Sequence, residues 1–475
     1  MDPPSPDPEV PVPHPVRSLR PLRPTRRALL LSAVVAGGAA GGLAACTQSD
    51  GTSSSAAGGS AARTDVSSLW DPTALHTIDA TVDADELTAM IQTYLDSGDK
   101  EWITGSVTID GTSFEEVGFK LKGNSSLKSI ATDDDPATLP WRIRLDKYVD
   151  DQGLEGAKDI VVRDNSTPSS LNEAVALDLL AEAGLASQLS VSTALAFNGG
   201  DPQLRLILEF LDDDWMASVF SADGILYKAK SDGDYSYRGD DAEDYTDIFD
   251  VEGGEEDFAP LIALLKCLEE ADDEEFAEQL PDLLEVDLFA RYLALEDLIG
   301  NFDDIEGPGN NSYLYYGPDT ETITIVAWDH NLAFGAQNGG GGSGMPDGGG
   351  MPSDGGGERP EDGERPDPGE MPDGATMPSD GGGDDGGAPG GGRGGGMGGG
   401  NVLASRFTAD EDFAALVEEQ ATALRTDLVD SGRAQEILDA RAAVLTEQAS
   451  ELITAEEVTT DSEQISSVLG GDDGS

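Results

Sequence analysis

The side chains best suited to chemistry are acids and amides within residues 301–331. Two runs rich in aromatic and β-branched residues, 312–316 and 322–328, flank the turn Gly317-Pro318-Asp319 and predict a β-hairpin. An antiparallel hairpin returns its chain, so Asp329 is expected beside the loop that precedes the first strand. The oxygen-bearing residues of that loop are Asp303, Asp304, Asn310 and Asn311. Carboxylate and amide oxygens suit Mg²⁺ with substrate phosphates, which predicts a cation site; a solvated acidic loop is the alternative.

The charge balance limits the classes of partner. The chain has 475 residues, with 93 acidic and 28 basic side chains and a formal net charge of -65. Such a chain repels nucleic-acid backbones and anionic lipid surfaces, so binding along DNA or RNA is excluded. A nucleotide phosphate requires a metal ion and a local basic pocket. The acidity also suits divalent cations or a basic, Ser/Thr-containing protein substrate.

The N-terminal residues indicate export and lipid anchoring. Several arginines precede a short apolar run, 28–45, which is typical of a signal peptide over residues 1–45 rather than of a membrane span. The run ends in Leu43-Ala44-Ala45-Cys46, which resembles a bacterial lipobox, and the paired arginines at 26–27 resemble a twin-arginine signal. We therefore expect Cys46 to be lipid-modified, with residues 46–65 as a flexible tether and the protein on the extracytoplasmic face of the bacterial cell membrane. Cys267, in an apolar helical stretch, is expected in the core.

The elements that must position the chemical residues lie mainly in residues 66–337. Strands come first and helices later along the chain, which predicts an α+β fold. Strands are expected at 78–82, 102–109, 114–122, 141–145 and 204–210, and helices at 85–97, at 171–183 and over much of 257–300. The helix at 171–183 is predicted to be amphipathic and to end at Gly184.

The composition changes after residue 337. Residues 338–400 are Gly/Pro/Asp/Met-rich with almost no large apolar side chains, which predicts a disordered insertion. Residues 401–455 resume a helical pattern and are expected to complete the domain. Residues 456–475 are polar and acidic, and we expect a frayed tail.

Seven segments in chain order resemble the CotH family of spore-coat-type atypical protein kinases, in the form found as actinobacterial lipoproteins. The resemblance spans about residues 70–337 and includes the C-terminal helices. The segments are VGFKLKGNSS (117–126), WRIRLDKY (141–148), SLNEAVALDLLAEAGL (170–185), ILEF (207–210), LYKA (226–229), LIGNFDDIEGPGNNSYLYY (298–316) and VAWDHNLAFG (326–335).

The resemblance implies a divergent protein-kinase-like fold, bound ATP and Mg²⁺ (with Ca²⁺ or Mn²⁺ as alternative cations) and phosphoryl transfer to Ser or Thr of a partner protein. It implies Asp303, in Asn301-Phe302-Asp303, as the catalytic residue that orients the acceptor hydroxyl. It also implies Asn311 and Asp329 as metal ligands, in preference to Asn310.

Phosphoryl transfer also needs cations against the phosphates. Lys122 and Arg144 are the expected phosphate contacts, and the loop with Asn124 and Ser125 offers backbone N–H groups. Arg142 lies two residues from Arg144 and shares its strand face, so either arginine could pair with Glu173 from the helix. The alternatives are solvent-facing cations and, for Glu173, helix-end electrostatics.

Other assignments complete the prediction. Glu209 is expected at the hinge that contacts the nucleotide base, and His330 is expected to support Asp329. Arg238-Gly239-Asp240 spells an adhesion tripeptide, but its acidic surroundings favour an ordinary loop. No GxGxxG or Walker loop is present, so ATP binding is implied by the family alone. Two other functions stay open: a non-catalytic cell-surface protein that uses the same cation site, and a glycan or small-molecule phosphotransferase.

Overall fold

The computed structural model describes residue 63 and residues 66–123, 125–230, 234–307, 311–336 and 401–471, except the side chain of Ser125. Residues 56–475 form one compact unit, which is described below. The predicted signal peptide, lipidated Cys46, most of the tether and the Gly-rich insertion lie outside the described residues. So do Asn124 and Asn310.

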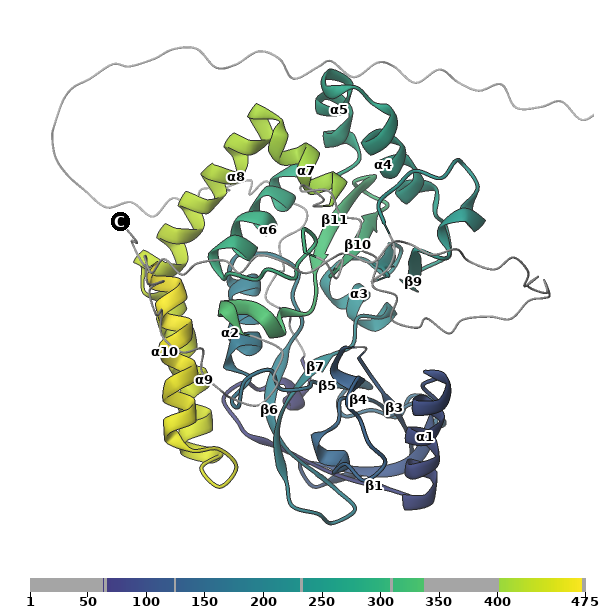
Figure 1. Ribbon diagram of the computed structural model, residues 1–475, viewed down its shortest axis with the longest axis vertical. Coiled ribbons are helices and arrows are strands. Elements are labelled where there is room, and N and C mark those ends of the chain that lie inside the picture. The colour runs from purple at the N-terminus through teal and green to yellow at the C-terminus, as the bar shows by residue number, and fades with distance from the viewer. Residues whose placement is uncertain are drawn as a thin grey trace, which may run out of the picture. The chain divides into compact units, whose positions relative to one another are not determined.

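Seven strands close into a barrel in the first half of the unit (Figure 1). They are β1 (His76–Val82), β2 (Ile103–Ile109), β3 (Thr112–Leu121), β4 (Trp141–Arg144), β5 (Asp159–Val162), β6 (Ser190–Phe197) and β7 (Gln203–Glu209). The order is β1-β2-β3-β4-β5-β7-β6, and a parallel pairing of β1 with β6 completes the closure. Alternate residues of β1 are buried, as a half-buried strand requires. The interior contains Phe119, Trp141 and Phe197, whose rings contact one another.

Helix α1 (Ala84–Ser97) follows β1 and has the ends that its sequence predicts. The Asp83 carboxylate accepts hydrogen bonds from the N–H groups of Asp85 and Glu86, which satisfies two donors at the helix start. Gly98 ends the helix with φ +81°, a conformation that glycine adopts without strain.

Helix α2 (Leu171–Glu182) differs from the amphipathic helix that we predicted. Every residue from Leu171 to Leu180 is buried except Asp178. The reason is that α2 packs against β6, α9 (Arg433–Gln448), α10 (Ala455–Gly470) and the segment 330–335, so little of its surface faces solvent. Gly184, with φ +75°, follows its end as expected.

A four-stranded antiparallel sheet, in the order β11-β10-β8-β9, forms the second half. Its strands are β8 (Ile225–Ala229), β9 (Phe249–Gly253), β10 (Ser312–Gly317) and β11 (Thr322–Ala327), and the helices of this region are α3 (Asp213–Val219), α4 (Ala259–Glu270), α5 (Asp273–Gln279) and α6 (Val286–Leu298). The predicted hairpin is confirmed, since β10 pairs with β11 from Ser312 opposite Ala327 to Gly317 opposite Thr322. Cys267 is buried in α4, as predicted. The described elements therefore confirm the α+β class.

The C-terminal residues form four helices and one π turn (Figure 1). They are α7 (Val402–Ala409), α8 (Glu411–Leu424), the π turn Arg425–Asp430, α9 (Arg433–Gln448) and α10 (Ala455–Gly470). The frayed tail predicted from residue 456 is wrong for the described part of that segment. Thr454 and Glu457 form a capping box, and Val458, Ile465 and Leu469 are buried at helical spacing.

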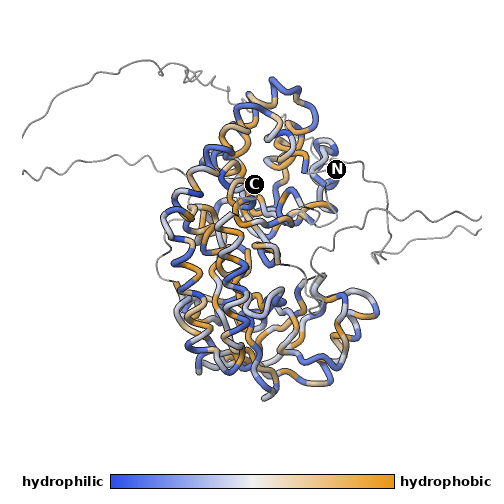
Figure 2. The backbone as a smooth tube through the Cα atoms, turned by 60° about the vertical axis from the view of Figure 1, so that its left-hand side comes forward, coloured by the Kyte–Doolittle hydropathy of each residue, from blue (hydrophilic) through white to orange (hydrophobic). Residues whose placement is uncertain are grey.

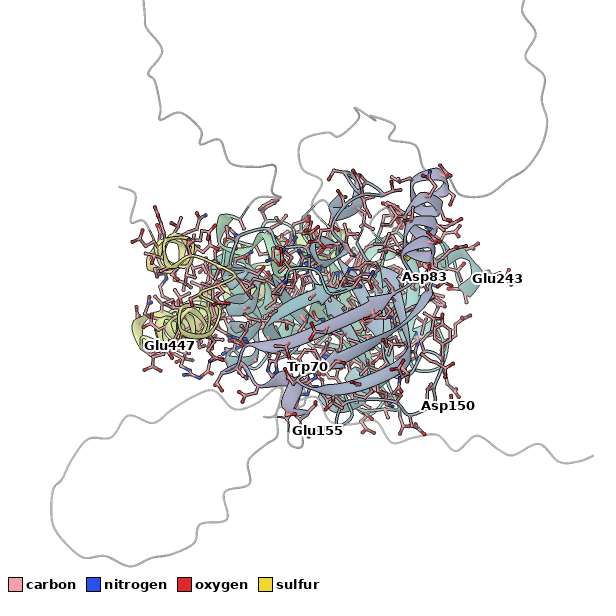
Figure 3. The ribbon with its side chains drawn as sticks, turned by 90° about the horizontal axis from the view of Figure 1, so that it is seen from below. Trp70, Asp83, Asp150, Glu155, Glu243 and Glu447 are labelled. Carbon is pink, nitrogen blue, oxygen red and sulfur yellow. The ribbon has the colours of Figure 1, made fainter. Side chains whose placement is uncertain are left out.

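Hydrophobic stretches recur in both sheets and in the helices that pack on them (Figure 2). Acidic side chains lie on the outside, for example the exposed Asp83, Asp150, Glu155, Glu243 and Glu447 (Figure 3). No helix in the described part of the chain has the length and apolarity that a membrane span requires.

Candidate functional site

Arg163 ties three elements together. It directly follows β5, and its Nε donates to Glu173 Oε2 at 2.9 Å, while its Nη2 donates to Asp329 Oδ1. Glu173 lies in the first turn of α2, and Asp329 lies just after β11 with a left-handed backbone, φ +68°. One guanidinium thus joins the barrel, the helix and the end of the hairpin.

The charge of Arg163 affects the protonation of both carboxyls that it contacts. Burial alone would oppose a charged carboxyl, but the Arg163 guanidinium holds the pKa of Asp329 below its usual range. Burial raises the pKa of Glu173 despite the same partner. Asp329 is therefore the more strongly ionised of the two and is a carboxylate at neutral pH.

The expected pairing of Glu173 with Arg142 or Arg144 is wrong. Arg142 donates from Nε and Nη2 to the carboxylate of Asp159 and lies over the ring of Phe210, 3.4 Å from its centroid. Arg144 donates to Asp146 Oδ1 at 2.7 Å and lies opposite Asp159 in the strand register. Acids close in sequence or on the neighbouring strand are therefore the partners of both arginines. Arg163, which the sequence reasoning did not select, takes the position at Glu173.

Two lysines supply further positive charge. Lys122 Nζ lies 4.9 Å from the ring centroid of Trp328 and 5.2 Å from that of Phe210. Lys228 Nζ, from β8, lies 5.6 Å from Trp328 and 5.5 Å from Tyr313. Neither ammonium has a carboxylate within ion-pair distance among the described residues. Burial lowers the pKa of Lys122 well below its usual range, and the nearby charges of Lys228 and Arg163 lower it further.

The predicted catalytic segment is held at the end of α6. The Asn301 side chain donates from Nδ2 to Glu296 Oε2 at 2.8 Å, and its backbone N–H donates to the Glu296 carbonyl at 3.0 Å. Asn311 Nδ2 donates to the Asp303 carbonyl oxygen at 2.7 Å, so the structure brings these two predicted residues together. Asp303 itself is half-buried.

His330 lies behind this segment. Its Nε2 is 2.9 Å from Glu296 Oε1, and both side chains are only 1% exposed. Burial opposes the imidazolium, but Glu296 raises the pKa of His330 above its ordinary value. Glu296 therefore holds both His330, the residue that follows Asp329, and Asn301.

Asp304 differs from its neighbour Asp303. It is 6% exposed, and burial together with the charge of Glu296 raises the pKa of Asp304 to about 7. Its Oδ1 accepts the Glu306 N–H at 2.9 Å. A carboxyl that is half protonated near neutrality and turned to its own backbone is a poorer metal ligand than Asp329.

The loop after β3 turns sharply at Gly123, where φ is +109°. A Cβ at this position would lie 2.1 Å from Ser126 Oγ, so the turn requires glycine. Lys100 Nζ donates to the Gly123 carbonyl oxygen at 2.5 Å. The predicted contributions of Asn124 and of the Ser125 side chain lie outside the described residues.

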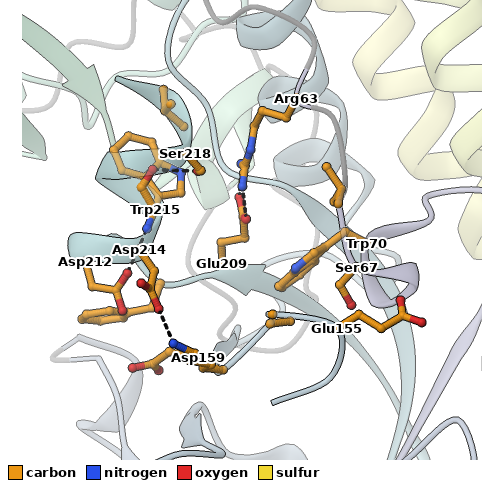
Figure 4. A pocket seen from close by; sticks show the side chains of 16 residues that line it. Arg63, Ser67, Trp70, Glu155, Asp159, Glu209, Asp212, Asp214, Trp215 and Ser218 are labelled. Carbon is orange, nitrogen blue, oxygen red and sulfur yellow. Dashed lines mark hydrogen bonds and ion pairs between the residues drawn. The ribbon is translucent and has the colours of Figure 1, made fainter. Parts of the chain in front are cut away.

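A pocket of about 460 Å³ lies at the end of β7 (Figure 4). Glu209 and Phe210, at the end of β7, line it together with Asp159, Asp212 and Trp215. Phe210 also contacts Lys122 and Arg142, so it joins the pocket to the charged cluster.

Glu209, the predicted hinge residue, has its carboxylate occupied. Arg63 donates to both of its oxygens at 2.6 and 2.5 Å, and the Leu189 N–H donates at 2.8 Å. Burial raises the pKa of nearby Asp212 to about 6. Glu209 thus lines the pocket as one half of an ion pair rather than as a free carboxylate.

The side chains near Asp329 include groups that could contact ATP and Mg²⁺. Lys122 and Lys228, which form no ion pair with a described carboxylate, suit phosphate oxygens. No group of three or more His, Cys, Asp or Glu side chains in the described ranges has a metal-holding arrangement. A metal ion bound by Asp329 and Asn311 would therefore need ligands from phosphates and water, which is the usual situation of Mg²⁺. The residues present fit both groups.

Comparison with known proteins finds one matching family model and a distant curated relative. Residues 119–466, more than half of the chain, match the family model described as "CotH kinase protein". Inner spore coat protein H of Bacillus subtilis (strain 168) is 25% identical over 189 residues, which are 38% of this chain and 51% of that protein. The chain thus spans about half the length of this curated relative.

Proposed function

The chain belongs to the CotH family, and from this premise we propose that it is an ATP- and Mg²⁺-dependent protein kinase with a divergent kinase-like fold. The observation that carries the proposal is the Glu173–Arg163–Asp329 chain of contacts, beside two lysines that form no ion pair with a carboxylate in the part of the chain that the structure describes. A strand cation paired with a helix glutamate, next to a metal-binding aspartate, is the arrangement that protein kinases require. Lipid anchoring outside the cytoplasmic membrane through Cys46 remains part of the same proposal.

Each group has a role that its contacts support. Asp329 and Asn311 would hold Mg²⁺, which would neutralise charge on the phosphates of bound ATP, and ATP would supply the phosphoryl group with ADP as the leaving group. Lys122 and Lys228 hold phosphate oxygens as point charges. Arg163, fixed by Glu173, orients Asp329. Asp303 accepts the proton of the acceptor hydroxyl, and the pocket at Phe210 takes the base and ribose, for which about 460 Å³ is sufficient.

Phosphoryl transfer tests the proposal directly. The full chain is incubated with γ-labelled ATP and Mg²⁺, and with peptide and polysaccharide acceptors side by side. We expect Mg²⁺-dependent transfer to Ser or Thr peptides, lost on Asp303→Asn and on Asp329→Ala. Asp304→Asn is the matched control: it keeps the acceptor for the Glu306 N–H and should keep activity. Transfer that survives Asp329→Ala in a folded protein would overturn the mechanism.

Nucleotide binding separates the kinase from a non-catalytic surface protein. Calorimetry should show ATP–Mg²⁺ binding that weakens about tenfold or more on Lys122→Ala, because one charge-assisted contact to phosphate is lost. Lys266→Ala is the control, since Lys266 lies on α4 and pairs with Asp240. Cation binding without any nucleotide affinity would support the non-catalytic alternative.

A further inference from the structure

A second group of cations surrounds Trp102, on the strand face that also carries Lys122. Lys147 Nζ lies 4.9 Å from the Trp102 ring centroid, and Lys120 Nζ and Arg142 Cζ each lie 5.7 Å from it. Lys120 and Arg142 are directly opposite each other in the register of β3 and β4. We call Trp102, Lys120, Arg142 and Lys147 the Trp102 patch.

Within the described ranges, Lys120 and Lys147 lack the carboxylate partners that several other lysines have. Lys158, Lys230 and Lys266 each lie 3.1–3.2 Å from an aspartate oxygen. No such ion pair is formed by Lys120 or Lys147 within the described ranges, although 93 of the residues are acidic. Burial lowers the pKa of Lys120, and Arg142 and Lys147 lower it further, whereas Glu252 opposes this. Arg142 pairs with Asp159, whereas Lys120 and Lys147 contact the Trp102 ring, and no ion pair in the described ranges balances the positive charge of these two lysines.

The patch adjoins the proposed phosphate site, and Arg142 contacts both Trp102 and Phe210. Lys120 and Lys122 are two residues apart on one strand face, about 7 Å along the chain. Lys122 contacts the rings of Phe210 and Trp328, whereas Lys120 and Lys147 contact Trp102. Lys120 and Lys147 therefore offer positive charge beside the proposed phosphate site.

We propose that the Trp102 patch binds acidic side chains of the acceptor polypeptide, so that the protein phosphorylates Ser or Thr in acidic sequences. This inference rests on the proposed kinase function and departs from the basic acceptor that the net charge suggested. Local contacts decide the preference because the Debye length at physiological ionic strength is about 8 Å, so most of the distant negative charge is screened at the patch. A basic acceptor would meet Lys120 and Lys147, which form no ion pair within the described ranges.

Peptide binding tests the patch without depending on catalysis. Two labelled peptides of equal length, each with one central Ser, are titrated into the full chain: one flanked by Glu and the other by Lys. We expect the acidic peptide to bind about tenfold or more tightly than the basic one. The double variant Lys120→Gln/Lys147→Gln should remove that difference, and Lys266→Gln should not change it. Circular dichroism and thermal unfolding of each variant establish that it is folded.

The outcomes for the patch and for the kinase differ. Tighter binding or faster phosphorylation of the basic peptide would overturn the acidic preference and leave the kinase proposal standing. Binding of the acidic peptide without phosphoryl transfer to either peptide would contradict the kinase proposal, and with it the role of the patch as an acceptor site. Polyphosphate that binds to the patch while neither peptide does would show that the ligand is an anionic polymer.

Discussion

Single residues in this protein act mainly through shared partners. Glu296 accepts hydrogen bonds from both Asn301 and His330, and Arg163 donates to both Glu173 and Asp329. Each shared partner joins a side chain near the proposed metal ligands to a helix. Loss of a shared partner should therefore cost more than loss of an isolated pair.

Replacing Arg163 tests this expectation. Arg163→Met leaves the buried Glu173 and the partly exposed Asp329 without their cation, and we expect the free energy of unfolding to fall by about 3–5 kcal/mol. Arg144→Met is the matched control, because Arg144 is 39% exposed and its pairs are worth about 1 kcal/mol or less. Urea denaturation measures both. Equal losses for the two variants would contradict a special role for Arg163.

Asp212 predicts an unusual dependence of stability on pH. Burial, the nearby charges of Asp159 and Asp214, and the Trp215 N–H bond together leave its pKa at about 6. Its folded pKa thus exceeds its unfolded value of about 3.9, so the folded state binds more protons between these values and stability falls as pH rises from about 4 to about 6.

Asp212→Asn removes this effect. Asn keeps a side-chain oxygen for the Trp215 N–H at the start of α3, so the cap is retained. We expect the variant to be more stable than the wild type by about 1–3 kcal/mol at pH 8 and equally stable near pH 4. Thermal unfolding across this pH range measures the difference. A difference that is constant with pH would show that the charge of Asp212 is not its source.

At the scale of elements, the sequence predicted those whose pattern is local. The hairpin of β10 and β11 has its turn residues and alternation in one stretch, and α1 has its acidic cap beside it. Strands β5, β6, β8 and β9 were missed; β5 has only four residues. Their assignment depends on neighbours far along the chain, as in the parallel pairing of β6 with β1.

The candidate site shows the same limit. Asp303 and Asn311 could be selected because they lie within one loop, and the structure brings them together. Arg163 was missed because Asp329, one of its partners, is 166 residues away. The only local signal was a lone arginine between the apolar run 160–162 and an acidic helix start.

Helix α10 contributes to the site from a distance. Asp461 accepts the Ser169 N–H at 3.0 Å, just before α2, and Gln464 donates to the Phe334 carbonyl oxygen at 3.0 Å, just after Asp329 and His330. The C-terminal helix thus contacts both segments that carry Glu173 and Asp329. A segment expected to be a frayed tail is therefore part of the support of the site.

Ile465→Ala tests the contribution of α10. Its side chain is 1% exposed, and removal of its buried atoms should lower the free energy of unfolding by about 2–5 kcal/mol. Glu463→Ala, at an exposed position of the same helix, should change it by less than about 0.5 kcal/mol. Chemical denaturation compares the variants. A frayed tail would make the two substitutions equally harmless.

At the scale of the whole molecule, several positive side chains gather near the proposed site although the chain as a whole is strongly acidic. The formal net charge is -65, yet Lys120, Lys122, Lys147 and Lys228 lie on the strands around the proposed site or directly beside them. The acidic exterior destabilises the folded state through self-repulsion, whereas these local cations attract anionic ligands. Salt should therefore have opposite effects on folding and on binding.

Raising NaCl from about 0.1 M to about 1 M shortens the Debye length from about 10 Å to about 3 Å. Weaker self-repulsion should raise the melting temperature of the free protein, while ATP–Mg²⁺ affinity should fall because its contacts are screened. Thermal unfolding and calorimetry at matched salt concentrations measure the two trends. In the Lys122→Ala variant, the melting temperature should still rise with salt. The ATP–Mg²⁺ affinity should fall less steeply with salt than in the wild type, because fewer charges contact the nucleotide. Affinity that does not respond to salt would mean that the phosphates are bound by uncharged groups.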